Sequence, residues 1–175
     1  IGYIGYDMVK VFEPKLHSKM DNLKDELNTP DLDLILPKII LVYSNKNHQL
    51  TLISTLQEMS DKFEMIESEL KGSYEYIHMK KNIGSDKGSF AHTKEQFFKM
   101  VDDSKEMIRS GDVFQILMTN RFTRKIKVDP FSFYRILRTK NPSPYMFLME
   151  YEDFNIVGSS PEVMVRVTNG ELLLR

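Results

Sequence analysis

Two prolines bracket a serine in the stretch Asn141–Phe147, which reads Asn-Pro-Ser-Pro-Tyr-Met-Phe. Proline fixes φ near about −65°, lacks a backbone N–H and pushes the preceding residue toward extended geometry. The chain therefore enters the apolar run from Tyr145 through a stiff corner, which suits the binding of a small polar ligand. The simpler interpretation is the start of a strand at a sheet edge, where proline is tolerated, and the residues alone favour it.

The composition is that of a globular protein without a strong electrostatic field. The 175 residues are 41% hydrophobic and 28% charged, enough for one domain or pieces of two. A net charge of −1 with dispersed lysines does not attract nucleic acid or an anionic membrane. The absence of cysteine excludes a disulfide framework and thiolate sites, and no apolar run approaches the ~20 residues of a membrane span. We expect a cytoplasmic protein without nucleic-acid or membrane partners.

Three segments carry helix signals. The apolar residues of Ser60–Lys71 follow helical spacing. Thr93 and Gln96 have the spacing of a capping box, and the helix that they begin is predicted to end at Gly111. Asp129–Pro130 predicts an N-cap followed by proline at the first helical position.

The strand signals favour hairpins. Residues 38–44 and 49–54 form β-branched runs around Asn45–His48, and Asn169–Gly170 is the strongest turn signal. Further strands are expected over residues 1–12, 113–118, 122–128, 145–151, 156–159, 163–167 and 171–174. Hairpins mixed with long helices predict an α+β fold with a largely antiparallel sheet.

A polar, glycine-rich stretch at residues 82–89 predicts a linker between two domains. We place the linker at residues 84–91, between domains at residues 1–83 and 92–175. Both ends of the sequence fall inside expected strands, where a cut leaves backbone groups unpaired. We therefore expect the chain to be an internal segment of a longer protein.

Several motifs occur in a set order along the chain. They are Gly2–Lys10, Gly111–Gln115, Asn120–Phe122, Asp129–Phe131, Asn141–Phe147 and Gly158–Glu162. Together they resemble the component I family of anthranilate synthases, within the chorismate-utilising enzymes. The resemblance implies a layered, largely antiparallel β-sheet core flanked by helices. It also implies that residues 1–83 are the end of an N-terminal domain and that residues 92–175 are the start of a chorismate-binding domain.

The resemblance also implies an activity. Such a carbon–oxygen lyase converts chorismate and ammonia into anthranilate and pyruvate in tryptophan biosynthesis, with Mg²⁺ as cofactor and tryptophan as feedback inhibitor. The ammonia comes from glutamine through a partner subunit, a glutamine amidotransferase called component II. The family's substrate-binding residues, metal ligands and catalytic histidine are expected beyond Arg175, and part of the tryptophan site before Ile1. The segment alone is therefore expected to be inactive.

Gln115 is the candidate catalytic residue. Strand alternation turns its side chain away from those of Phe114 and Ile116. In related enzymes that add water to chorismate, the matching position carries a lysine that acts as general base. A carboxamide cannot remove a proton at neutral pH, but it can position a nucleophile such as ammonia. From the residues alone, a structural glutamine is the simpler interpretation. Aminodeoxychorismate synthase component I resembles this chain at Gln115, so it stays an alternative.

The proline corner distinguishes these two aminating enzymes, because aminodeoxychorismate synthases differ there. The resemblance implies a tryptophan-binding site made by Asn141, Pro142, Ser143, Pro144, Tyr145 and Met146. The last three would pack on the indole, and an aromatic ring and a thioether suit an indole face. A non-catalytic amino-acid-binding module is a further alternative.

The chain departs from the family at a few positions. Lys10 stands where an arginine is expected, and Met118 and Asn120 vary the segment after Gln115. The four histidines do not have the spacing of a metal site or a catalytic triad, so no metal site is expected within this segment.

Overall fold

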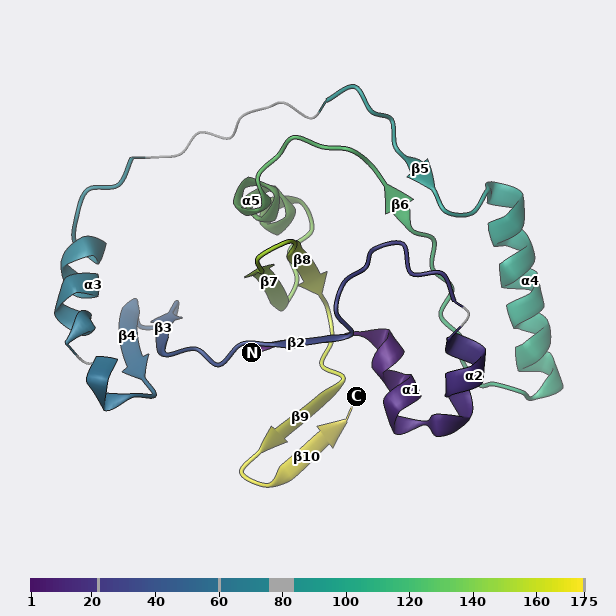
Figure 1. The fold of residues 1–175 in the computed structure, drawn as a ribbon, viewed down its shortest axis with the longest axis horizontal. Coiled ribbons are helices and arrows are strands. Elements are labelled where there is room, and N and C mark those ends of the chain that lie inside the picture. The colour runs from purple at the N-terminus through teal and green to yellow at the C-terminus, as the bar shows by residue number, and fades with distance from the viewer. Residues whose placement is uncertain (22, 60, 76–83, 175) are drawn as a thin grey trace. The chain divides into compact units, whose positions relative to one another are not determined.

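The structure, a computed structural model, describes residues 1–21, 23–59, 61–75 and 84–174 (Figure 1). The chain divides into two compact units, residues 1–76 and 77–175. The described strands form two-stranded antiparallel ladders and are accompanied by helices, which confirms the α+β class. The domain assignment with its boundary at residue 83 stays a prediction. Of the residues discussed above, Ser60, His78, Asn82, Ile83 and Arg175 lie outside the described residues.

The first unit opens with strand β1 (Gly2–Ile4), which pairs antiparallel with β2 (Leu32–Leu34). A Cβ atom at Gly2 would lie 2.1 Å from the carbonyl oxygen of Asp33, so only glycine allows this approach. The strand expected over residues 1–12 is wrong beyond Ile4. The Met8 N–H donates to the Gly5 carbonyl at 3.2 Å, so local turn bonds replace the ladder. Four short helices follow: η1 (Tyr6–Met8), α1 (Val9–Phe12), η2 (Pro14–Leu16) and α2 (His17–Met20).

The predicted hairpin in this unit is confirmed. Strand β3 (Ile39–Ser44) pairs with β4 (Gln49–Ser54) in a register that places Ser44 opposite Gln49. The 3₁₀ helix η3 (Gln57–Met59) and helix α3 (Lys62–Leu70) follow, so the helix predicted from Ser60 begins at Lys62.

In the second unit, helix α4 (Lys94–Ser110) has the predicted capping box. The Thr93 hydroxyl accepts from the Gln96 N–H at 3.3 Å, and the Gln96 side chain accepts from the Thr93 N–H at 2.9 Å. Gly111 ends the helix with φ of 83°, a left-handed conformation that favours glycine. Both ends of the helix are therefore encoded locally.

Replacing Thr93 with alanine should destabilise the protein by about 1 kcal/mol, because the N–H of Gln96 loses its acceptor. The free energy of unfolding, measured by urea titration of the complete protein, checks this. Thr93→Ser keeps the hydroxyl and is the matched control. Equal stability of Thr93→Ala and the parent would contradict the capping role.

Helix α5 (Pro130–Lys140) begins at the predicted N-cap. The Asp129 carboxylate accepts from the Ser132 N–H at 2.8 Å, and this hydrogen bond holds the pKa of Asp129 below its ordinary value. The cap is therefore strongest when Asp129 is ionised and weakens as the pH falls through its lowered pKa.

Two hairpins follow α5. Strand β7 (Tyr145–Glu150) pairs with β8 (Asn155–Ser160), and β9 (Val165–Thr168) pairs with β10 (Glu171–Leu174). The turn at Asn169–Gly170 has φ of 51° and 84°, which confirms the turn predicted there.

The strand expected over residues 113–118 is wrong, because the chain is irregular there. The strand expected over residues 122–128 shrinks to β6 (Phe122–Thr123), which pairs with β5 (Ser89–Phe90) inside the predicted linker. A strand requires a hydrogen-bonded neighbour, and for residues 113–118 the described part of the chain provides none.

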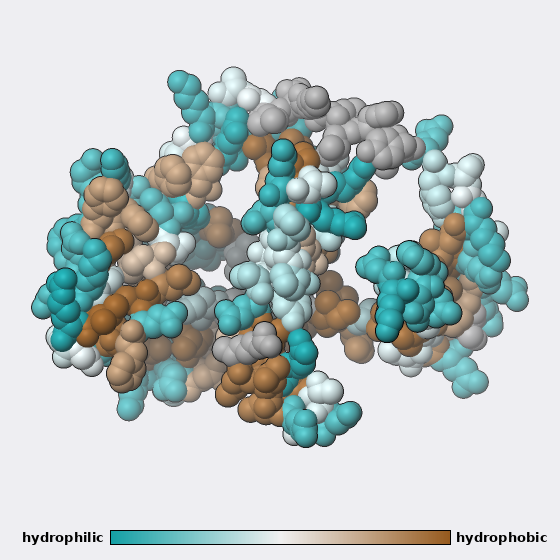
Figure 2. Space-filling view, turned by 180° about the vertical axis from the view of Figure 1, so that it is seen from behind, coloured by the Kyte–Doolittle hydropathy of each residue, from teal (hydrophilic) through white to brown (hydrophobic). Residues whose placement is uncertain are grey.

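Apolar side chains remain accessible throughout the described residues, as the brown areas of Figure 2 show. No hydrophobic side chain is buried among them, and the buried residues are Ser104 and Ser132. In the described part of the chain, the helices are too short or too polar to cross a bilayer.

Candidate functional site

Hydrogen bonds hold the first residue of the proline corner, Asn141, on both its N–H and its carbonyl. The Asn141 N–H donates to the Leu137 carbonyl of α5 at 2.8 Å, and the Ser159 hydroxyl donates to the Asn141 carbonyl at 2.7 Å. Within the corner, the Ser143 hydroxyl donates to the Ser160 carbonyl and accepts weakly from the Tyr145 N–H at 3.4 Å. The corner is therefore held between the end of α5 and the end of β8.

The β7–β8 register determines which side chains share a face. Tyr145 lies opposite Ser160, Met146 opposite Ser159 and Phe147 opposite Gly158. Successive strand residues face opposite sides, so Tyr145 and Met146 project from opposite faces of β7. The structure therefore does not bring these two predicted indole contacts onto one surface of the strand.

The Phe147 ring explains why the motif Gly158–Glu162 begins with glycine. A Cβ atom there would lie 2.0 Å from Cζ of Phe147, so the ring covers the backbone of β8 at this point. The sequence showed both residues but not their pairing, which depends on the register.

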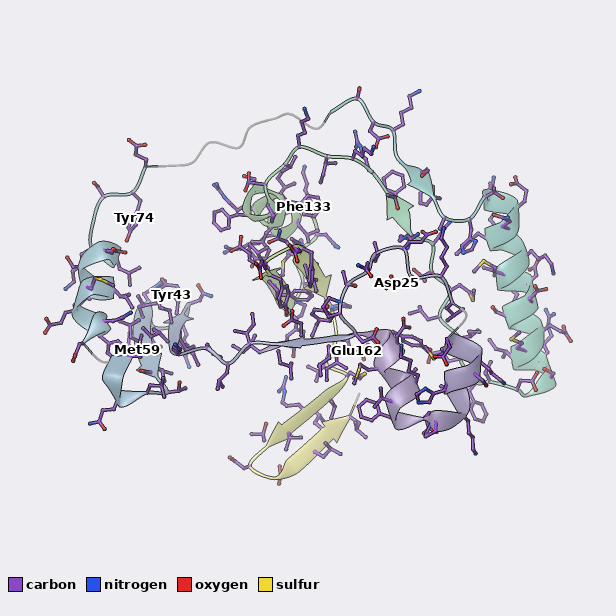
Figure 3. The ribbon with its side chains drawn as sticks, in the orientation of Figure 1. Asp25, Tyr43, Met59, Tyr74, Phe133 and Glu162 are labelled. Carbon is purple, nitrogen blue, oxygen red and sulfur yellow. The ribbon has the colours of Figure 1, made fainter. Side chains whose placement is uncertain are left out.

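An open hollow of about 380 Å³ lies beside the corner. Its lining residues are Tyr145, Glu162, Val163, Met164, Val165 and Arg166. The Arg166 guanidinium donates to the Tyr145 hydroxyl at 2.9 Å. Glu162, labelled in Figure 3, is exposed in the segment that joins β8 to β9. The hollow therefore combines one aromatic ring, apolar side chains and two opposite charges.

Gln115 lies in the irregular segment after α4, where its side chain is exposed. The side chain makes no hydrogen bond within the described part of the chain, and the neighbouring Phe114 is fully exposed. Gln115 is not among the residues that line the hollow beside the corner.

Met118 and Asn120, the two departures after Gln115, anchor this segment. The buried Ser104 hydroxyl donates to the Met100 carbonyl at 2.6 Å and lies 2.9 Å from the Met118 sulfur. The Asn120 side chain accepts from the His92 N–H and donates to the His92 carbonyl, both at 3.0 Å. In the sequence, Met118 and Asn120 stood out only as departures from the family, and these contacts were not predicted.

Lys10, the third departure, is paired. Its ammonium group lies 3.1 Å from the Asp31 carboxylate, and this hydrogen bond and the attraction between the charges raise the pKa of Lys10. Lys10 therefore keeps a positive charge at the position where the family resemblance predicts an arginine.

No group of three or more His, Cys, Asp or Glu residues within the described ranges is placed to hold a metal ion. The described histidines also lie apart in the sequence, and His48 hydrogen-bonds Tyr43 at 3.1 Å. Within the described ranges, the structure thus offers no cluster of three such side chains for Mg²⁺.

Curated relatives match nearly the whole chain. Anthranilate synthase component 1 of Lactococcus lactis subsp. lactis is 33% identical over 181 residues, covering 98% of this chain and 38% of the relative. The protein of the same name from Aquifex aeolicus is 28% identical over 187 residues, covering 100% of this chain and 37% of the relative. The chain thus spans less than half the length of these relatives.

A solved structure agrees with the fold. The crystal structure of anthranilate synthase component I from Streptococcus pneumoniae TIGR4 matches with a TM-score of 0.81 and 28% identity, covering 98% of this chain and 40% of that one. A family profile described as chorismate binding enzyme matches residues 1–175. The chain belongs to the chorismate binding enzyme family.

Proposed function

We propose that the complete protein containing this chain is anthranilate synthase component I. It converts chorismate and ammonia into anthranilate and pyruvate, as a lyase of tryptophan biosynthesis in the cytoplasm. The observation that carries the proposal is the similarity of the whole chain to relatives that bear this name.

Gln115 supports the aminating branch of the family. An amide can donate and accept hydrogen bonds but does not take up a proton at neutral pH. It therefore suits a nucleophile that is already competent, which ammonia is and water is not. In the proposed enzyme, Gln115 contacts ammonia in the chorismate site and orients it. Its exposed side chain, which makes no hydrogen bond in the described part of the chain, leaves the amide accessible for this contact.

The proposed regulation concerns the corner Asn141–Met146. Tryptophan binds there as feedback inhibitor, with the indole against Pro144 and one of the two flanking side chains, Tyr145 or Met146. The hydrogen bonds that fasten the corner support this role, because a fixed wall costs little conformational entropy on binding.

The proposal includes a cofactor and a partner. Magnesium is the proposed cofactor, held by residues other than those described here. The proposed partner is a glutamine amidotransferase, component II, which supplies ammonia. The designation component 1 of the relatives supports a second component.

The deciding experiment incubates the complete protein with chorismate, ammonium and Mg²⁺ and follows anthranilate fluorescence together with pyruvate release. Both products should appear in equal amounts. Consumption of chorismate without pyruvate would instead indicate aminodeoxychorismate synthase, with which Gln115 is also compatible. Tryptophan binding without chorismate consumption would indicate a non-catalytic amino-acid-binding module.

A further inference from the structure

The Tyr145 ring has two supports of different kinds. Its backbone is fixed by the first pair of the β7–β8 ladder, opposite Ser160, while its hydroxyl is held by Arg166 at 2.9 Å. Arg166 belongs to β9, which is a strand of the next hairpin. The hydrogen bond therefore connects the proline corner to an element that the β7–β8 ladder does not reach.

This connection matters because packing covers the Tyr145 side chain only in part. The residue is 40% exposed and lines the hollow of about 380 Å³. A ring that is not buried can change rotamer, and a hydrogen bond from a charged donor is stronger than one between neutral groups. The hydrogen bond from the guanidinium can therefore stabilise one rotamer of the Tyr145 ring over the others.

Within the described part of the chain, the charge of Arg166 is not paired with a carboxylate. The ion pairs among the described residues do not include Arg166, although Glu162 lines the same hollow. Because the Tyr145 oxygen accepts from Arg166, the phenolic hydrogen remains available to a ligand. Polarisation by the guanidinium makes that hydrogen a better donor.

We infer that Arg166 is a positioning residue that holds the Tyr145 ring in the orientation that receives the tryptophan inhibitor. This inference rests on the proposed tryptophan site at the corner. It adds a residue outside the corner, on β9, that sets the affinity of that site through the Tyr145 hydroxyl.

The test is a double-mutant cycle in the complete protein, read as the inhibition constant for tryptophan. Arg166→Met keeps an unbranched apolar stem and removes the donor, and Tyr145→Phe keeps the ring and removes the acceptor. Each change should raise the inhibition constant about threefold to tenfold, the usual range for one lost hydrogen bond. The inhibition constant of the double variant should be no higher than that of the single variant with the larger effect.

Two further variants separate positioning from general loosening. Arg166→Lys keeps a charged donor and should restore part of the lost inhibition. Arg109→Met removes an arginine that pairs with Glu106 on α4 at 3.2 Å and should leave inhibition as in the parent. The inhibition constant should also change more than the KM for chorismate, which a general loss of structure would shift as well.

Three outcomes would overturn the inference. If Arg166→Met weakens inhibition equally in the Tyr145→Phe background, Arg166 acts on the ligand directly. If Arg166→Met has no effect while Met146→Thr weakens inhibition, the corner site stands and the positioning role fails. If tryptophan does not inhibit the parent enzyme, the proposed site and the inference fail together.

Discussion

The Gln115→Leu variant of the complete protein is expected to lose about one to two orders of magnitude in kcat with ammonia. Leucine has nearly the same size but cannot make hydrogen bonds, so ammonia loses the group that orients it. Ammonia gains positive charge as it attacks, hydrogen bonds to charged groups contribute about 1.5–3 kcal/mol, and each 1.36 kcal/mol is tenfold in rate. Steady-state kinetics with ammonium as the nitrogen source give the comparison.

The fold should survive this change. Gln115 is exposed, and its neighbours Met118 and Asn120 keep the contacts that anchor the segment to α4 and to His92. Circular dichroism and the midpoint of thermal unfolding should match the parent. Gln115→Asn is the matched control, because it retains a carboxamide one methylene shorter and should lose less activity than leucine. Parent-like kinetics for Gln115→Leu would contradict the proposal that Gln115 orients ammonia.

The sequence was most informative where structure depends on neighbours in the chain. The capping box at Thr93, the N-cap at Asp129 and the turn at Asn169–Gly170 each use hydrogen bonds or dihedral angles within about four residues. Such features can be read directly from residue types, and all three are confirmed.

Elements that require a distant partner were less predictable. The run at residues 113–118 has the apolar composition of a strand, but alternation alone does not supply the neighbour that a ladder needs. The same limit applies to the candidate site. The sequence located the corner, but the fastening of Asn141 by Ser159 and the contact of Arg166 with Tyr145 follow from strand register.

The β7–β8 register also determines which corner side chains can contact the same ligand. The family resemblance implied that Pro144, Tyr145 and Met146 pack together on an indole. The pairing of β7 with β8 places Tyr145 and Met146 on opposite faces, with Tyr145 toward the hollow shared with Arg166. A ligand beside Pro144 would therefore contact one of these side chains directly. The other would affect binding only indirectly, through the position of the β7 backbone.

Met146→Thr and Pro144→Ala are expected to weaken tryptophan inhibition several-fold. Pro144 is a direct wall contact, whereas Met146 lies on the face opposite Tyr145 and acts by packing behind the strand that carries the Tyr145 ring. Losing either apolar contact costs about 1 kcal/mol or more, while allosteric coupling is typically ~1–3 kcal/mol in total. Met146 is half-buried at the second pair of the ladder, and threonine suits a strand, so the ladder should persist. Pro144→Ala acts differently, because it lets the corner move and raises the entropy lost on binding.

Calorimetric titration of tryptophan into the complete protein, with the inhibition constant measured in parallel, tests both variants. Met149→Thr is the matched control, because it makes the same chemical change in β7 at the pair with Ile156, three pairs beyond Met146. It should bind tryptophan as the parent does if the wall is the corner itself. Parent-like affinity in both Met146→Thr and Pro144→Ala would place the inhibitor elsewhere. In that case the two prolines would only define where β7 begins, since a fixed φ before the first ladder pair limits how the strand can start.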